Sequence, residues 1–103
     1  MKIGTRVGAI LCAKATGGQA PVVDLLGFGE YLGDEVPDEQ ALGGLAEDCR
    51  AAQIPNPKIR LDSGKIVWGC ECWWGSEKMV RKMLEGAVVV ERDIDEARRE
   101  YDG

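Results

Sequence analysis

Most residues that could do chemistry in this chain lie in one stretch, residues 56–76, which holds all three tryptophans and two of the four cysteines. Cys70 and Cys72 stand two residues apart with Glu71 between them. A thiolate can act as a nucleophile or a metal ligand, and a carboxyl group in apolar surroundings can act as a general acid. The stretch therefore offers three candidate chemistries: nucleophilic attack, metal binding and proton transfer.

The sequence contains no histidine, which rules out many of the sites that could carry out these chemistries. Ser-His and Cys-His nucleophile pairs and mixed Cys/His zinc sites are excluded. A zinc site made of Cys12, Cys49, Cys70 and Cys72 is the metal arrangement that remains, but structural zinc ligands usually come in pairs spaced by two to four residues on turns. We therefore expect free thiols packed as small apolar groups, with no metal, no cofactor and no catalytic residue.

The tryptophans give a stronger signal than the thiols. Trp73 and Trp74 are consecutive, so on a strand their rings point to opposite faces, and we expect one ring in the core and the other at the surface. Tryptophan is enriched at interface hot spots because it buries a large area and keeps one N–H donor. We predict a binding surface at this corner, formed by Trp73, Trp74, Trp68, Tyr31 and Glu71.

Two functions fit such a surface. The first is a small non-enzymatic interaction module that self-associates, as a dimer or another homo-oligomer, or binds a protein partner through the tryptophan corner. The alternative is a small-molecule binder or weak enzyme, with a cleft lined by tryptophan, Glu71 and the strand glycines, in which Glu71 has a raised pKa. A flat apolar patch rimmed by charge would favour the first, and a concave pocket with convergent polar groups would favour the second.

Composition limits the class of partner. The chain has 103 residues, is 45% hydrophobic and 30% charged, and carries a net charge of −5. Such an acidic surface repels phosphate backbones, and Lys78, Arg81 and Lys82 are interpreted as the solvated face of one helix, so we expect no nucleic-acid partner. The apolar runs are too short to span a membrane, and the N-terminus does not resemble a signal peptide. We expect a cytoplasmic protein of a single domain, residues 1–103.

Alternation, glycine turns and helical spacing place the elements that hold these residues. The predicted strands are residues 3–13, 21–32, 58–61, 65–72 and 87–90. The two central strands form a hairpin around residues 62–64, whose last residue is glycine. The first predicted helix follows Gly43-Gly44 and ends at Pro55, with Leu42, Leu45, Ala46, Cys49 and Ala52 at helical spacing. Two further helices are predicted from the N-cap Ser76 to Gly86, and onward from Asp93. The second helix is expected to bury Met79, Val80, Met83 and Leu84.

This order predicts an α+β fold: a small antiparallel curved sheet or SH3-like partial barrel of about five strands, with two or three helices. An open five-stranded sheet is the alternative. Gly27 and Gly29 share one face of the second strand, and glycine within a strand marks a bend or a place where something crosses closely. We expect Trp68 or Trp73 to lie over this glycine track.

The block Trp68-Gly69-Cys70-Glu71-Cys72-Trp73-Trp74-Gly75, together with residues 3–9, 26–31 and 54–61, resembles a set of short hypothetical proteins of bacteria, phages and mobile gene pools. The resemblance covers most of the chain, and the tryptophan block is its most specific part. It implies an accessory intracellular protein. No activity comes with it, so it assigns no catalytic residue.

Overall fold

The computed structural model describes residues 1–15, 17–38 and 44–100 of the chain. Its strands are β1 (Arg6–Lys14), β2 (Val22–Glu35), β3 (Asn56–Leu61), β4 (Ile66–Trp68), β5 (Trp73–Ser76) and β6 (Val88–Glu91). Its helices are α1 (Gly44–Ala51), α2 (Glu77–Leu84), α3 (Ile94–Glu100) and a single 3-10 turn, η1 (Gly69–Glu71). Leu42, which helical spacing groups with the apolar residues of the first predicted helix, lies outside the described residues.

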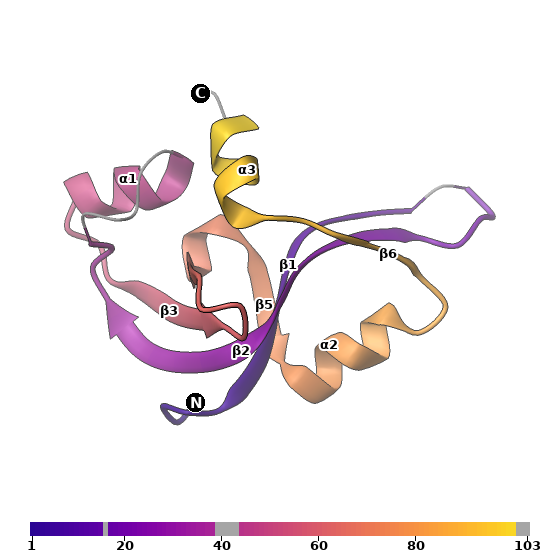
Figure 1. Cartoon of the computed structure of the whole chain (residues 1–103), viewed down its shortest axis with the longest axis horizontal. Helices are drawn as coiled ribbons and strands as arrows, with labels where there is room; N and C mark the ends of the chain where they lie inside the picture. Colours follow the sequence, from indigo (N-terminus) through magenta and orange to yellow (C-terminus); the bar gives the residue numbers. More distant parts are fainter. Residues whose placement is uncertain (16, 39–43, 101–103) are drawn as a thin grey trace.

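The long strand β2 organises a curved, unclosed sheet (Figure 1). The sheet order is β4-β3-β2-β1-β5, and β6 pairs with β2 off this path. β6 runs parallel to β2, whereas the other pairs are antiparallel. The first part of β2 lies between β1 and β6, and its second part lies between β1 and β3. The α+β prediction is confirmed, with six strands in place of about five.

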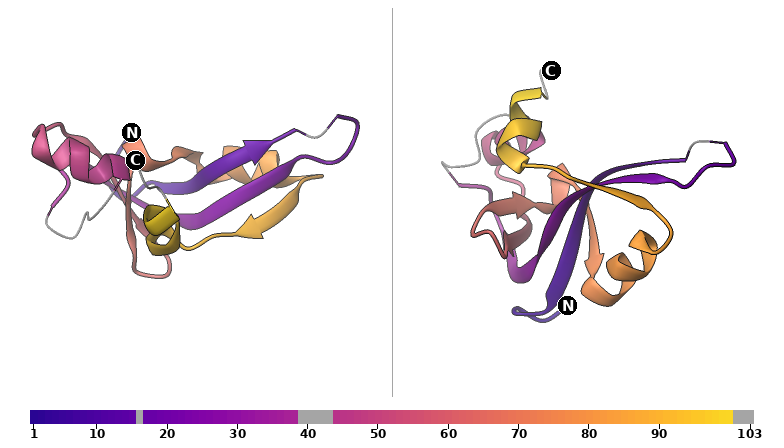
Figure 2. Two further views of the ribbon diagram at one scale, coloured as in Figure 1. Left: turned by 90° about the horizontal axis from the view of Figure 1, so that it is seen from above. Right: turned by 45° about the vertical axis from the view of Figure 1, so that its right-hand side comes forward.

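The two ends of the sheet differ in shape. Near η1, the sheet packs with α1 and α3, while at the other end β6, β2 and β1 extend side by side as a three-stranded arm (Figure 2). We call this part, made of β6, residues 22–25 and residues 10–14, the arm. The β1–β2 pairing shifts register between Ala9 and Cys12, beside Gly27, whose φ of 141° is accessible mainly to glycine. This irregularity lies where the body of the sheet passes into the arm.

The glycine track is crossed by a neighbouring strand, and the expectation that a tryptophan covers it is wrong. A Cβ built on Gly29 would lie 2.7 Å from the Cα of Leu61 and closer still to the carbonyl oxygen of Arg60. Beside Gly27, the nearest atoms belong to the side chain of Leu61. The absence of a side chain at Gly29 therefore lets β3 approach β2 closely.

Both faces of β1 are buried at residues 7–10. Val7 and Ala9 lie in the main core, and Leu11 packs against it. On the other face, Ile10 belongs to a second core beneath α2, where Val80 is fully buried. The main core comprises Val7, Ala9, Leu26, Tyr31, Ile59, Leu61, Val67 and Ile94. The second comprises Ile10, Val23, Leu25 and Val80.

All five predicted strands differ from the structure by at least one residue at an end, and in two of them the chain takes a different course. Residues 3–5 form a turn instead of a strand, because Gly4 has a positive φ of 92° and the Thr5 hydroxyl donates to the carbonyl of Lys2 at 2.6 Å. The predicted strand 65–72 ends at Trp68, where the chain turns through η1 and joins the opposite end of the sheet as β5. Gly69 allows this turn, since a Cβ there would lie 2.7 Å from the ring of Pro57. Cys70 and Cys72 therefore do not share a strand face with Trp68.

The hairpin between β3 and β4 is confirmed. Gly64 adopts a φ of 94°, and its N–H donates to the carbonyl of Leu61 at 2.8 Å. Within the described ranges, no helix is long and apolar enough to cross a lipid bilayer.

Candidate functional site

The turn η1 separates the three tryptophans into three environments. Trp68, at the end of β4, is buried, and Trp74 stacks on Tyr31 with ring centroids 5.6 Å apart and planes 10° from parallel. Trp73 points to the other face of β5 and is 47% exposed. The predicted division of Trp73 and Trp74 between two faces is confirmed. Of the five predicted site residues, Trp73 is the aromatic ring most available to a partner, because Trp68 and Tyr31 are core residues.

The exposed ring of Trp73 lies within a larger apolar surface. A Cβ built on Gly75 would lie 2.7 Å from the terminal methyl of Met79 and 3.4 Å from the Trp73 ring, so both side chains lie over this glycine. Met79 and Met83 are about as exposed as Trp73. We call Trp73, Met79 and Met83 the Trp73 patch. Methionine is flexible and polarisable, and such side chains are frequent at adaptable binding surfaces.

The patch borders a shallow groove of about 230 Å³ along β1. Its lining residues are Ile10, Leu11, Cys12, Ala13, Trp73 and Met83. β5 pairs with β1 only as far as Ile10, so residues 11–14 have β2 on one side and no paired strand on the other among the described residues. The groove therefore lies beside an open strand edge, which can accept another strand.

The methionines of this patch were predicted to be buried, and that prediction is wrong. α2 has only eight residues, and it presents Val80 to the sheet, where a Cβ on Gly8 would lie 2.7 Å from Val80 Cγ1. Val80 and Leu84 therefore form the inner stripe, and Met79 and Met83 form a neighbouring outer stripe with the same i, i+4 spacing. Helical spacing cannot choose between adjacent stripes. The sequence signal for this site is a second apolar stripe on α2, made of Met79 and Met83, which follows shortly after Trp73.

Positive charge borders the patch. Lys78 and Lys82 are exposed on α2, and neither forms an ion pair with another described residue. Arg81, by contrast, pairs with Glu77 at 3.1 Å and lies over the Phe28 ring, 4.2 Å from its centroid. The prediction of a solvated helix face holds for the two lysines. They give a basic edge to an apolar surface on an acidic protein.

Glu71, the fifth predicted site residue, is bound within the fold. Its two carboxylate oxygens accept hydrogen bonds from Nε and Nη2 of Arg98, each at 2.7 Å, and one also accepts from the backbone N–H of Trp68 at 3.1 Å. The side chains of Glu71 and Arg98 are only 5% and 12% exposed. The hydrogen bond to Glu71 raises the pKa of Arg98 above its usual value. Glu71 is thus ion-paired within the fold, and its carboxylate anchors α3 to the η1 turn.

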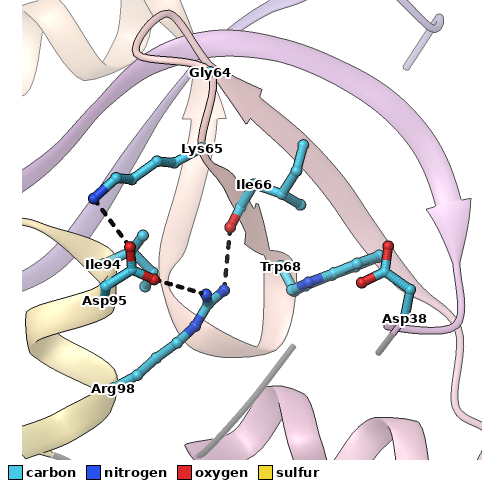
Figure 3. A pocket seen from close by; sticks show the side chains of 8 residues that line it. All are labelled: Asp38, Gly64, Lys65, Ile66, Trp68, Ile94, Asp95 and Arg98. Carbon is cyan, nitrogen blue, oxygen red and sulfur yellow. Dashed lines mark hydrogen bonds and ion pairs between the residues drawn. The ribbon is translucent and has the colours of Figure 1, made fainter. Parts of the chain in front are cut away.

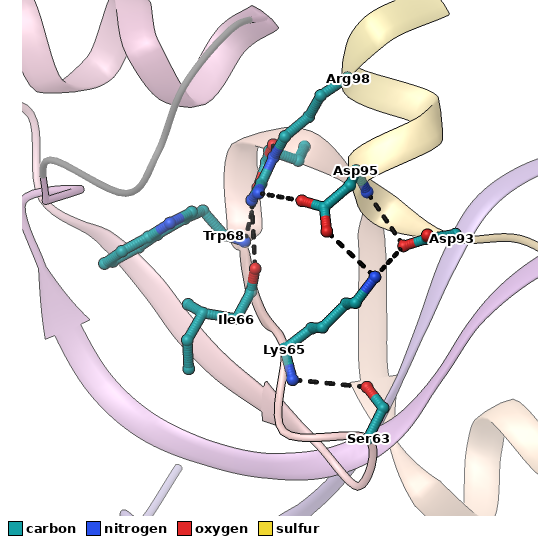
Figure 4. Close-up of polar contacts among 8 residues, drawn as sticks. Ser63, Lys65, Ile66, Trp68, Asp93, Asp95 and Arg98 are labelled. Atoms are coloured by element: carbon teal, nitrogen blue, oxygen red, sulfur yellow. Dashed lines mark hydrogen bonds and ion pairs between the residues drawn. The ribbon is translucent and has the colours of Figure 1, made fainter.

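A second hollow, of about 310 Å³, lies beside this anchor (Figure 3). Lys65 Nζ contacts Asp93 at 2.6 Å and Asp95 at 3.0 Å, while Arg98 contacts Asp95 at 3.5 Å and the carbonyl of Ile66 at 3.1 Å (Figure 4). Asp95 thus pairs with both Lys65 and Arg98. These four charged groups satisfy one another and dock α3 on the β3–β4 hairpin. The hollow is therefore a weaker candidate for ligand binding than the Trp73 patch.

The cysteines belong to no metal-ligand cluster within the part of the chain that the structure describes. Burial first, and then the neighbouring thiol of Cys49 in α1, raises the pKa of Cys70 in η1. Burial raises the pKa of Cys72 to about 12. All four cysteines are free in the structure. A thiol whose pKa lies well above neutral is a weak nucleophile and a poor metal ligand at pH 7.

Alkylation will test this description of the thiols. At pH 7, Cys70 and Cys72 should react with iodoacetamide at least tenfold more slowly in the folded protein than in denaturant, because their raised pKa values leave little thiolate. Their rates in the folded protein should rise with pH up to the folded pKa. Site-resolved mass spectrometry of timed samples measures both. Equal rates in folded and denatured protein would contradict the prediction.

Comparison with known proteins assigns no function, so a function is inferred from the geometry of the site. No protein-family model, curated protein or solved structure matched the chain. The family resemblance drawn from the tryptophan block therefore stays a prediction.

Proposed function

We propose that this chain is a non-enzymatic interaction module, which binds an extended segment of a protein partner at the Trp73 patch. The partner segment would lie along the groove and add as a strand to residues 11–14 of β1. One observation carries the proposal: an exposed tryptophan lies beside two exposed methionines, at an apolar groove that follows an unpaired strand edge. Strand addition supplies backbone hydrogen bonds, and side-chain pockets beside the edge supply selectivity.

Apolar contact would provide most of the binding energy. Trp73 is a rigid side chain with a large area, and such residues dominate measured interface energies. The two methionines can adjust their conformations around a partner side chain at small cost. Trp74 supports the site from behind, because its stacking on Tyr31 fixes the backbone that carries Trp73.

Charge favours an acidic partner segment. Lys78 and Lys82 stand at the edge of the patch, and Lys14 is exposed at the end of the open part of β1. None of the three pairs with another described side chain. We therefore expect the bound segment to alternate apolar residues, which enter the groove, with aspartate or glutamate, which face these lysines.

The alternative function, a small-molecule binder or weak enzyme, has less support. Its proposed cleft required Glu71 and the strand glycines, but Glu71 is paired with Arg98 and Gly29 lies against β3. The remaining exposed ring, Trp73, adjoins a groove lined mainly by apolar side chains. This shallow, apolar and charge-rimmed surface is closer to the patch expected of an interaction module than to a pocket with convergent polar groups.

Peptide display will test the proposal and define the partner's chemistry. Random peptides selected on the wild-type protein should converge on alternating apolar and acidic residues. Trp73→Ser should weaken the selected peptides about thirtyfold, because a hot-spot tryptophan contributes roughly 2 kcal/mol. Fluorescence anisotropy of labelled peptides measures this affinity, and the emission of Trp73 should shift to shorter wavelength as the ring is buried.

Ile54→Ser is the matched control, because Ile54 is a similarly exposed apolar residue outside the patch. It should leave peptide affinity unchanged. Lys82→Glu should weaken acidic peptides and reduce the dependence of their binding on salt. Failure to select any peptide, or equal affinity for Trp73→Ser and wild type, would overturn the proposed function.

A further inference from the structure

A second interaction surface lies on the outer strand of the arm, away from the Trp73 patch. Among the described residues, β6 pairs with β2 alone and is the outermost strand of the arm (Figure 2). Val88, Val89 and Val90 are 53%, 41% and 40% exposed. Natural edge strands are usually protected by charge, proline or a bulge, because their unpaired backbone groups attract other strands. Residues 88–90 have none of these protections, and their pairing with β2 has no register shift.

The hydrogen bonds of β6 show which backbone groups are available. Val88 donates its N–H to the carbonyl of Pro21 at 2.8 Å, and Arg92 donates to the carbonyl of Leu25 at 2.9 Å. Successive residues of a strand direct their backbone groups to alternate sides. Val88, Val90 and Arg92 therefore face β2, while Val89 and Glu91 direct their N–H and C=O groups outward. Val89 thus presents, at the middle of the valine run, a backbone donor and a backbone acceptor that no other described residue uses.

We propose that the free edge of β6 pairs antiparallel with the same edge of a second copy of this chain, centred on Val89. A residue with both backbone groups directed outward can form two hydrogen bonds with its own symmetry mate in an antiparallel ladder. The resulting dimer has two-fold symmetry, and both copies contribute an identical surface. Its sheet runs continuously from β1 through β2 and β6 into the second copy.

The sequence of β6 selects a second copy as the occupant and selects this register. With Val89 opposite Val89 of the second copy, Val88 lies opposite Val90, so every cross-strand pair in the run joins two valines. Cross-strand pairs of β-branched side chains stabilise a sheet. A register centred on Glu91 would place two carboxylates opposite each other, which is unfavourable. In the Val89 register, Glu91 faces Ala87 instead, and no like charges meet.

This dimer leaves the Trp73 patch free, because the patch lies on α2 and β5 while the pairing uses the opposite edge of the arm. Each dimer would then carry two partner sites. A partner with two binding segments would gain affinity from their linkage. The dimer does not depend on the proposed function, so an experiment can contradict one proposal without contradicting the other.

Solution mass and two edge variants will test the dimer. Sedimentation equilibrium of the reduced wild-type protein should show a mass that rises with concentration to twice the 11.2 kDa of one chain. Val89→Lys places a charge against its own symmetry mate, and Val89→Pro removes a donor that β2 does not use. Both variants should be monomers with the wild-type circular dichroism spectrum. Trp73→Ser should remain a dimer.

Crosslinking will test the register. Paired residues in an antiparallel ladder have Cα atoms about 5.5 Å apart, within the range of a disulfide. Val89→Cys treated with oxidised glutathione should form a disulfide-linked dimer, while wild type and Val88→Cys should not, because Val88 does not face itself. A wild-type protein that is monomeric at every concentration, Val89 variants that dimerise like wild type, or a mass that increases beyond the dimer would overturn the proposal.

Discussion

Gly29→Ala is expected to leave the chain largely unfolded. The added Cβ would lie 2.7 Å from the Cα of Leu61 and closer to the carbonyl oxygen of Arg60. Both are backbone atoms of β3, so no side-chain rotation can relieve the overlap. Separating the strands would break the β2–β3 ladder, and we expect a loss of more than about 4 kcal/mol, comparable to the total stability of a small domain. Circular dichroism and chemical denaturation measure this loss.

Gly17→Ala is the matched control for that variant. It adds the same methyl group in the loop between β1 and β2, where a Cβ would meet no atom within 4 Å. We expect its unfolding free energy to lie within about 0.5 kcal/mol of wild type. Wild-type stability of Gly29→Ala would show that β3 does not approach β2 as the structure describes.

Glu71→Gln is expected to lower the free energy of unfolding by about 3 kcal/mol, because removing one member of a buried ion pair leaves the other charge uncompensated. Arg98 is held in place mainly by the two bonds to Glu71, and only its contacts to Asp95 and the Ile66 carbonyl would remain. α3 should detach before the sheet unfolds. Urea denaturation followed by circular dichroism measures the loss.

Glu30→Gln provides the comparison for an exposed pair. Glu30 contacts Arg60 at 3.4 Å, and their side chains are 41% and 52% exposed. Exposed pairs contribute at most about 1 kcal/mol, so this variant should be nearly as stable as wild type. If Glu71→Gln cost no more than Glu30→Gln, Glu71 would not anchor α3, and its availability as a general acid would have to be considered again.

These expectations divide the tryptophan block into structural and interaction residues. Trp68, Trp74 and Glu71 hold η1 and β5 in place, and Trp73 is left at the surface. The block is therefore a folded corner that presents one ring. This division explains why five conspicuous residues in the sequence do not form one binding surface.

Local signals in the sequence determined most of the elements correctly. The Gly64 turn between β3 and β4, the Ser76 N-cap of α2 and the alternation of β1 rest on interactions within a few residues, and all three are confirmed. The opposite orientation of Trp73 and Trp74 follows from strand geometry alone. The absence of histidine excluded whole classes of catalysis without any structure.

Tertiary structure decided which residues of the tryptophan block and of α2 are buried and which are exposed. η1 interrupts a predicted strand because Gly69 must pass the Pro57 ring, which is distant in sequence. Met79 and Met83 are exposed because α2 packs on the sheet through the stripe of Val80 and Leu84. Glu71 is ion-paired because α3 brings Arg98 to it from 27 residues away. Periodicity reports which residues share a face, but burial depends on what the rest of the chain places against that face.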